Sequence, residues 1–513
     1  MRTTKNLPMI ERAIAHGDRP AISGGTASHT YADLVSRSHA VAAALLEGRR
    51  DLAEERIAIL VPPAADFVVA QWATWRAGGI AVPLSLAATD KELDYALVDS
   101  GTSCVVTTSQ PAATHSRLLS ERGVRTVVLE HVEERRRASL LSATLPDVAP
   151  ERRAMILYTS GTTGRPKGVV TTHACIQAQV ESLVSAWRWR GDDQIPLFLP
   201  LHHIHGIINV LSCGLWVGAQ VDGLGRFVTE EVFAKVAAGG YTLFMAVPTI
   251  YVKMIEAISA LPARRREAVV AGFRGMRLMV SGSAALPVSV HQQWEALTGQ
   301  RLLERYGMTE IGMALSNPLD GERRPGAVGV PLPGVSVGLW SEQGEPVVGE
   351  GVPGEIRVRG PNVFLEYWQR PEATRESFAD GWFRTGDTAA VENGYYRILG
   401  RSSVDIIKSG GYKLSALEIE AALLEHPAIA ECAVVGVPDA TWGEAVAVAI
   451  VPRAGASIGL RELREWCRDR ISPYKIPRMV LPVTALPRNA MGKCNKPMVL
   501  SLFESGAAEP GLQ

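Results

Sequence analysis

The strongest constraint on the fold is an alternation of short apolar runs with segments of helical spacing. Residues 56–62 have the composition of a buried strand, residues 65–77 follow with helical spacing, and the glycines at 78–79 end that helix. Further apolar runs begin at Cys104 and Arg125. Because strands separated by helices pair in parallel, this pattern predicts an α/β fold in which helices flank large sheets.

The pattern changes beyond about residue 354, where strand-like alternation and turn-forming dipeptides replace it. The segments with these signals are residues 355–360, 380–381 and 393–394, followed by helical patterns at 416–425 and 460–470. A chain of 513 residues also exceeds the roughly 250–300 residues at which one core stops growing. We therefore predict a multi-part N-terminal domain at 1–400 and a small α+β domain at 401–513.

Composition excludes several classes of function. Lys+Arg and Asp+Glu both number 53, so no basic excess favours nucleic acid. The six cysteines form no C-x-x-C pair, and the eleven histidines lack zinc-ligand spacing. Residues 1–18 lack the apolar segment of a signal peptide, and no run of about 20 apolar residues occurs. We expect a cytoplasmic enzyme without a membrane span, either a monomer or a homodimer.

The segment from 158 to 170 is the most informative motif. It follows a predicted strand and combines glycines, hydroxyl groups and a cation: Thr159, Ser160, Gly161, Thr162, Thr163, Gly164, Lys167 and Gly168. Such a loop exposes backbone N–H groups and suits a polyphosphate. It is not a Walker A motif, because Pro166 precedes Lys167 and Gly168 follows it.

This loop resembles the phosphate-binding loop of the adenylate-forming superfamily, which includes acyl-CoA synthetases, adenylation domains and luciferases. Four further segments resemble that family's motifs in the same order: residues 304–310, 384–387, 399–420 and 487–493. The resemblance implies an acid–CoA ligase that uses ATP and Mg²⁺, forms an acyl-AMP intermediate, and transfers the acyl group to coenzyme A. It also implies the two-domain architecture described above, with the domain at 401–513 as a mobile lid.

The resemblance implies a nucleotide site in the N-terminal domain. Thr159 and the other residues of the loop would contact the β- and γ-phosphates, Thr309 the α-phosphate, and Glu310 would ligate Mg²⁺. Tyr306 would lie near the adenine, with Gly307 beside it. Asp387 would accept hydrogen bonds from the ribose, and Arg401 would contact ribose or phosphate.

In the lid, Lys493 is implied as the adenylation lysine, and we predict no catalytic role for the neighbouring Lys496. Ser403 occupies the pivot about which relatives rotate the lid, where many of them carry Asp or Lys. Gly410 and Gly411 would present backbone beside the pantetheine arm of coenzyme A.

The segments 200–206, 247–253, 280–287, 403–408 and 437–443 resemble the malonyl-CoA and methylmalonyl-CoA synthetase branch. The resemblance implies a substrate site with Lys253 and Ser283 on the distal carboxylate, His205 or secondarily His203 near the acyl channel, and Met308. A buried cation facing the acyl group makes physical sense only if the acid has a second carboxylate. The sequence therefore predicts malonate or methylmalonate as the substrate.

Three alternatives stay open at this point. The same adenylation motifs would serve a ligase for short or medium monocarboxylates. They would also serve a stand-alone enzyme that loads a carrier protein instead of coenzyme A. A catalytically inactive nucleotide-binding regulator is disfavoured, because Lys493, Glu310 and Asp387 are all present.

Overall fold

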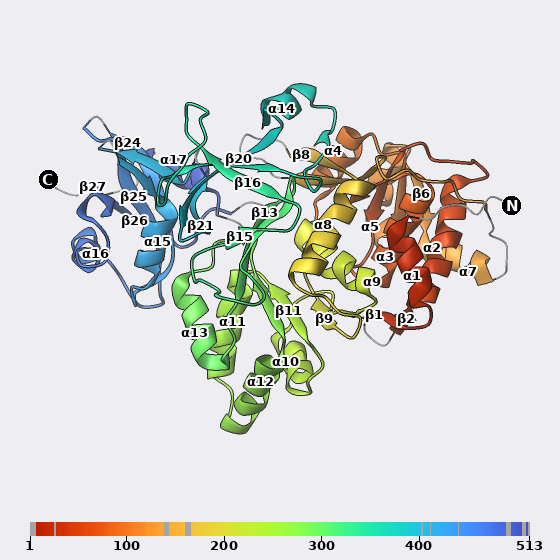
Figure 1. Cartoon of the computed structure of the whole chain (residues 1–513), viewed down its shortest axis with the longest axis horizontal. Coiled ribbons are helices and arrows are strands. Elements are labelled where there is room, and N and C mark those ends of the chain that lie inside the picture. The colour runs from red at the N-terminus through yellow and green to blue at the C-terminus, as the bar shows by residue number, and fades with distance from the viewer. Residues whose placement is uncertain are drawn as a thin grey trace.

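The computed structural model describes residues 7–24, 27–137, 143–159, 166–401, 404–410, 412–439, 441–488, 494–504 and 509–510. The described strands form five sheets. The N-terminus and the C-terminal part lie at opposite ends of the long axis, with the strands β13 to β21 between them (Figure 1). The fold is the mixed α/β fold that the alternation predicts.

The largest sheet has seven strands in the order β18-β8-β7-β4-β3-β5-β6. Their bounds are β3 Arg56–Leu60, β4 Ile80–Pro83, β5 Cys104–Thr107, β6 Arg125–Val128, β7 Arg153–Thr159, β8 Lys167–Thr172 and β18 Glu366–Tyr367. The strands β7, β4, β3, β5 and β6 are parallel, whereas β8 pairs antiparallel with β7 and β18. The predicted strands at 56, 104 and 125 are thus confirmed.

Two further sheets complete the α/β part. One has the order β2-β1-β10-β9 (β1 Pro20–Gly24, β2 Ala27–Thr30, β9 Gln194–Leu197, β10 Gln220–Gly223). The other has the order β11-β12-β13-β14-β15 (β11 Leu243–Ala246, β12 Leu278–Ser281, β13 Leu303–Met308, β14 Gly312–Ser316, β15 Val330–Pro331). Parallel pairing of β11, β12 and β13 aligns their carboxyl ends at one edge, where ligands of α/β folds bind.

The fourth sheet is antiparallel, as the change of pattern predicts. It contains β16 Ser336–Trp340, β17 Gly354–Arg359, β19 Phe378–Ala379, β20 Trp382–Glu392 and β21 Tyr395–Arg401. Both of its predicted turns form, with positive φ at the two central residues: Asp380 and Gly381 before β20, Asn393 and Gly394 after it.

The fifth sheet belongs to the C-terminal part. Its strands are β22 Ile406–Ser409, β23 Tyr412–Ser415, β24 Ile429–Asp439, β25 Gly443–Pro452, β26 Met479–Pro482 and β27 Glu509–Pro510. The two hydrophobic clusters of this part begin at Ile407 and Ala433, whereas the main core of the N-terminal part, with the residues packed against it, extends to Ile398. The two parts therefore bury separate cores, and the boundary at 400/401 stays a prediction.

The helices cover these sheets. In chain order they are α1 Pro8–His16, α2 Tyr31–Leu46, α3 Ala65–Arg76, α4 Asp90–Ser100, α5 Ser109–Thr114, α6 Ser116–Glu121, α7 Leu129–Arg137, α8 His173–Ala186, the π-helix η1 His205–Ser212, α9 Cys213–Val217, α10 Thr229–Ala237, α11 Pro248–Ser259, α12 Ala263–Gly275, α13 Val288–Thr298, α14 Pro371–Glu376, α15 Ala416–Leu424, α16 Leu460–Cys467, the 3₁₀-helix η2 Pro473–Lys475 and α17 Lys496–Glu504. Among the described residues, none of these helices is long and apolar enough to cross a bilayer.

Candidate active site

The predicted phosphate loop is anchored by the hairpin of β7 and β8. Residues 160–165, which include Ser160, Gly161, Thr162, Thr163 and Gly164, lie outside the described residues. At the end of the hairpin next to these residues, Thr159 pairs with Lys167. The ammonium of Lys167 lies 5.0 Å from the centroid of the Tyr367 ring. Tyr367 belongs to β18, which pairs with β8. The pairing of β7, β8 and β18 therefore places the Tyr367 ring beside Lys167.

Tyr367 connects this loop to Glu310. Its hydroxyl donates a hydrogen bond of 2.9 Å to Oε1 of Glu310, which lies in the turn between β13 and β14. Burial raises the pKa of the Glu310 carboxyl above its ordinary value. Thr309, beside it, is half-buried. A buried carboxylate is a hard oxygen ligand that suits Mg²⁺ held mainly by phosphates.

A second group of polar side chains surrounds Asp387 on β20. Its Oδ2 accepts a hydrogen bond of 2.5 Å from the Tyr306 hydroxyl, and its Oδ1 lies 3.1 Å from Nε of Arg401. Burial and the negative charge of Asp387 raise the pKa of Tyr306. Sequence reasoning assigns all three residues to the nucleotide, and the fold brings them into direct contact.

The two groups belong to one site. Besides the dominant effect of burial, Arg401 lowers and Asp387 raises the pKa of Glu310 through their charges. The turn that holds Glu310 needs a glycine at 307, because a Cβ there would lie 2.1 Å from the carbonyl oxygen of Gly312. A carboxylate for Mg²⁺, a carboxylate–arginine pair for ribose and a loop for phosphates together fit a bound Mg²⁺–nucleotide.

A third group lies where η1 meets the end of β12. Nδ1 of His205 lies 3.2 Å from Oγ of Ser283, which also accepts a hydrogen bond of 3.2 Å from Nη2 of Arg305. Burial, followed by the nearby charge of Arg305, holds the pKa of His205 well below its ordinary value, so the imidazole is neutral. Ser283 has a φ of +71°, a strained conformation of the kind that clusters at functional sites.

Among the described residues, several polar atoms of this third group have no hydrogen-bond partner. They are Nε2 of His205, Nε of Arg305, and both side-chain polar atoms of Asn209, one helical turn beyond His205 on η1. Arg305 is 4% exposed, burial lowers its pKa to about 9, and its side chain donates to the Ser283 hydroxyl rather than to a carboxylate of the described residues. A buried cation without a carboxylate is costly, so this group is suited to an anionic ligand.

Sequence reasoning missed Arg305. A signal was present, because Arg305 lies inside the motif segment 304–310, two residues after the apolar pair Leu302 and Leu303. Successive residues of a strand point to opposite faces, so β13 can direct Arg305 toward Ser283 and Tyr306 toward Asp387.

The structure corrects the argument for Lys253. The buried face of α11 consists of Pro248, Tyr251, Met254 and Ile258, and Lys253 falls on its exposed side. The premise of a buried cation at Lys253 is therefore wrong, and it holds for Arg305 instead. Any contact of Lys253 with the substrate stays a prediction without that support.

The other predicted site residues are distributed as follows. His203 is half-buried, with its ring 4.2 Å from that of His202, and Met308 is half-buried at the end of β13. Gly410 has a φ of +57° and lies against the ring of Trp442. Lys493, Ser403 and Gly411 lie outside the described residues, so their predicted roles stay predictions.

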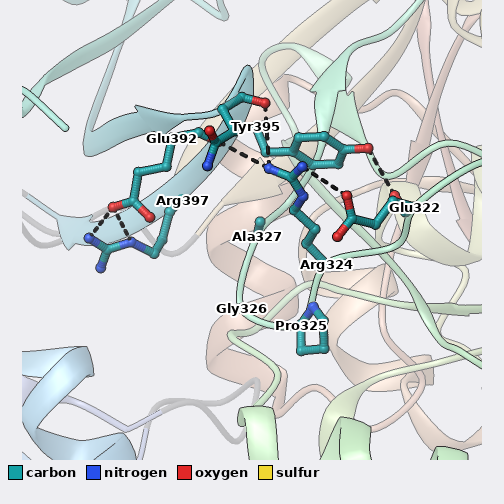
Figure 2. A pocket seen from close by; sticks show the side chains of 9 residues that line it. Glu322, Arg324, Pro325, Gly326, Ala327, Glu392, Tyr395 and Arg397 are labelled. Carbon is teal, nitrogen blue, oxygen red and sulfur yellow. Dashed lines mark hydrogen bonds and ion pairs between the residues drawn. The ribbon is translucent and has the colours of Figure 1, made fainter. Parts of the chain in front are cut away.

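Figure 2 shows a separate hollow between the loop after β14 and the hairpin of β20 and β21. Its charged side chains pair with one another: Arg324 with Glu322 at 2.8 Å, and Arg397 with Glu392 at 2.7 Å. Arg324 also lies 4.1 Å from the centroid of the Tyr395 ring. None of the predicted site residues lines this hollow, and its paired charges leave no free cation for an anionic ligand.

With this geometry established, the chain can be placed in a family. Residues 10–368 match the AMP-binding enzyme family, and residues 418–493 match the C-terminal domain of AMP-binding enzymes. The chain belongs to the AMP-binding enzyme family.

Within that family, the chain is 44% identical to the mitochondrial malonate–CoA ligase of Bos taurus, over 100% of this chain and 93% of that protein. It resembles the crystal structure of ATP-bound MatB from Rhodopseudomonas palustris with a TM-score of 0.87 and 33% identity, over 98% of this chain and 100% of that one. A malonyl-CoA ligase in ternary product complex with methylmalonyl-CoA and AMP has a TM-score of 0.68 and 39% identity, over 94% of this chain and 100% of that one. The predicted cytoplasmic location is not confirmed, because the animal relatives are named as mitochondrial proteins.

Proposed function

We propose that the protein is an ATP-dependent acid–CoA ligase that converts malonate or methylmalonate into its CoA thioester through an acyl-AMP intermediate. The observation that carries the substrate assignment is Arg305, a buried guanidinium that donates to the Ser283 hydroxyl and whose Nε has no partner among the described residues. A dicarboxylic acid would supply the missing carboxylate while its other carboxylate reacts. The relatives named malonate–CoA ligases support the same substrate class.

In this proposal, the distal carboxylate of the acid binds Arg305, with help from Ser283. The neutral imidazole of His205 lies 3.2 Å from the hydroxyl of the same serine and would donate a hydrogen bond to the acyl group. Arg305 and Tyr306 are adjacent on β13, so the acid and the nucleotide would approach each other across one strand.

ATP would bind with its phosphates at the loop after Thr159, its Mg²⁺ at Glu310 and its ribose at Asp387. The proximal carboxylate attacks the α-phosphorus, which produces acyl-AMP and pyrophosphate. Negative charge grows on the phosphate oxygens in that step, so Lys167, Arg401 and Lys493 would stabilise it. The thiol of coenzyme A then displaces AMP.

The arrangement of the two parts supports an assignment to the first half-reaction. The chain superimposes better on the ATP-bound relative, at a TM-score of 0.87, than on the product complex, at 0.68, although the latter is more similar in sequence. We propose that the arrangement in Figure 1 is the one in which the acid is adenylated.

The test is release of pyrophosphate with ATP, Mg²⁺ and coenzyme A across malonate, methylmalonate, acetate, butyrate and octanoate, with the CoA products identified by mass. We expect a clear preference for the two dicarboxylates. Preference for a monocarboxylate would overturn the substrate assignment and leave the enzyme class intact. Product formation on a carrier protein but not on coenzyme A would overturn the assignment of coenzyme A as the acyl acceptor.

A further inference from the structure

Lys496 is the first residue of α17 and forms ion pairs with two carboxylates. Its Nζ lies 2.5 Å from Oδ1 of Asp405 and 2.7 Å from Oε1 of Glu420. The three side chains are 10%, 12% and 15% exposed, so all of them are largely removed from water. Burial alone would lower the pKa of Lys496, but the two carboxylates more than offset that effect and raise it.

This set of three charges, Lys496 with Asp405 and Glu420, is connected to the nucleotide site. Oδ2 of Asp405 accepts a hydrogen bond of 2.9 Å from the backbone N–H of Arg401. Arg401 in turn reaches Asp387 through its Nε. Because the predicted boundary lies between residues 400 and 401, the contact of Arg401 with Asp387 crosses it, and Asp405 lies on the same side as Arg401.

The close approach of Asp405 is built into the backbone. Gly400 has a φ of +130°, and a Cβ at this position would lie 2.3 Å from Cβ of Asp405. The backbone N–H of Asp405 also donates a hydrogen bond of 2.8 Å to the carbonyl of Arg401. The end of β21 at Gly400 and Arg401 is therefore packed directly against the side chain of Asp405, whose carboxylate Lys496 neutralises.

At its other end, Lys496 adjoins the segment of the predicted adenylation lysine. Arg488 and Cys494 form a β-bridge, and the backbone N–H of Asn495 donates a hydrogen bond of 2.8 Å to the carbonyl of Pro487. These contacts flank residues 489–493, which include Lys493 and lie outside the described residues. Lys496 directly follows Asn495, and Oε1 of Glu420 accepts a hydrogen bond of 2.7 Å from the backbone N–H of Val434.

A buried ion pair is seldom more stabilising than apolar residues of the same size, so stability alone does not account for three charges here. The set has a geometric effect instead. It joins Lys496, which follows the segment of Lys493, to Asp405, whose carboxylate accepts a hydrogen bond from the backbone of Arg401. We infer that Lys496 is a positioning residue for acyl-AMP formation, which it supports by holding these two segments in register through Asp405. This inference rests on the proposed function.

The experiment compares Lys496→Met with the wild-type protein in two separate assays: pyrophosphate formation from ATP and acid, and thioester formation from supplied acyl-AMP and coenzyme A. We expect Lys496→Met to lower the first rate about tenfold or more, since small misplacements of reacting groups have effects of this size, and the second rate much less. Lys475→Met is the matched control. Lys475 forms an ion pair of 2.5 Å with Glu418, which lies on α15 as Glu420 does. Because this pair does not include Asp405, the rate of pyrophosphate formation should be unchanged in Lys475→Met.

A second variant separates positioning from folding. Lys496→Met combined with Glu420→Gln removes the excess negative charge and should restore the thermal midpoint, but it leaves Asp405 without its cation. We expect adenylation to stay impaired in this double variant. The inference would be overturned if the double variant recovered both stability and adenylation. It would also be overturned if folded Lys496→Met lost both half-reactions equally, or if it formed pyrophosphate at the normal rate.

Where Lys496→Met fails to fold, Asp405→Asn serves the same comparison, because it keeps the acceptor for Arg401 and the pair between Lys496 and Glu420. A normal adenylation rate in Asp405→Asn would overturn the inference. A wild-type protein that releases no pyrophosphate with any acid would instead overturn the proposed function, so the two failures are distinguishable.

Discussion

At the scale of single residues, the site is defined by charges that the fold buries without full compensation. The side chain of Arg305 donates a hydrogen bond to Ser283, and the side chain of Glu310 accepts one from Tyr367. Both positions cost free energy in the absence of ligands, because a buried charge lacks the solvation that water gives it. Ligands of opposite charge, a carboxylate and a metal ion, would recover that cost on binding.

Arg305→Met tests the charge on the acyl side. It should raise the KM for malonate about 30-fold or more, because truncating one partner of a buried charge pair costs about 2–5 kcal/mol. The KM for butyrate should change little, since butyrate has no second carboxylate. Steady-state kinetics on both acids measure the difference.

The matched control is Lys253→Met on the exposed side of α11. We expect less than about a threefold effect on malonate, since exposed ion contacts contribute about 0–1 kcal/mol. A large malonate-specific effect of Lys253→Met together with a small one of Arg305→Met would return the substrate role to Lys253.

Glu310→Gln tests the charge on the nucleotide side through pH. Burial raises the folded-state pKa of Glu310 above its unfolded value, so in the interval between the two the folded protein holds a proton that the unfolded chain has released. Wild-type stability should therefore fall as pH rises through that interval. The variant lacks this titration and should unfold at higher urea than wild type at neutral pH, with the difference vanishing at acidic pH.

The same variant should lose the stabilisation that Mg²⁺ and ATP give the wild-type protein, because its amide is a weaker metal ligand. Urea midpoints across pH, with and without Mg²⁺–ATP, measure both effects. A variant that is less stable than wild type at neutral pH would contradict the assignment of Glu310 as a strained, buried charge.

At the scale of elements, β13 and η1 carry the site. β13 has Arg305 on one face and Tyr306 on the other, and its register with β14 shifts between Tyr306 and Gly307. The π-helical backbone of η1 places His205 and Asn209 one turn apart, a geometry frequent at functional sites. Gly206 allows this helix to begin, because a Cβ there would lie 2.5 Å from the carbonyl oxygen of Pro200.

Gly307→Ala tests the turn between β13 and β14. The added methyl group would collide with the carbonyl oxygen of Gly312, so the turn must open. We expect a loss of about 1–3 kcal/mol in stability, typical of overpacking, together with weaker ATP binding because Glu310 moves. Thermal unfolding and nucleotide titration measure these changes.

Gly275→Ala is the control, since a Cβ at Gly275 has no neighbour within 4 Å and the residue lies at the end of α12. It should leave both stability and ATP affinity nearly unchanged. Equal behaviour of the two variants would mean that the turn tolerates a side chain and that Gly307 has no special role.

At the scale of the whole molecule, two separate cores are joined through β21 and the residues that follow it. The main core reaches Ile398, and the C-terminal clusters begin at Ile407. A chain with this division can change the orientation of its smaller part without unpacking either core. The two half-reactions can therefore use different orientations of the same lid.

Lys493→Ala tests that division of labour. It should abolish formation of acyl-AMP, because a cation that stabilises the developing charge is removed, and leave thioester formation from supplied acyl-AMP largely intact. Separate assays of the two half-reactions measure the outcome. Equal loss of both in a folded variant would contradict the predicted role of Lys493.

The sequence by itself determined the α/β alternation, the antiparallel turns at 380–381 and 393–394, and the motifs that place the chain in its family. These are local properties, because apolar period, turn dipeptides and glycine spacing act over a few residues. Which cation is buried is not local. Lys253 and Arg305 both lie in motif segments, and only packing against η1 and β12 buries Arg305, while helical phase exposes Lys253. The same reason applies to Lys496, whose partners Asp405 and Glu420 become its neighbours only when the C-terminal part folds.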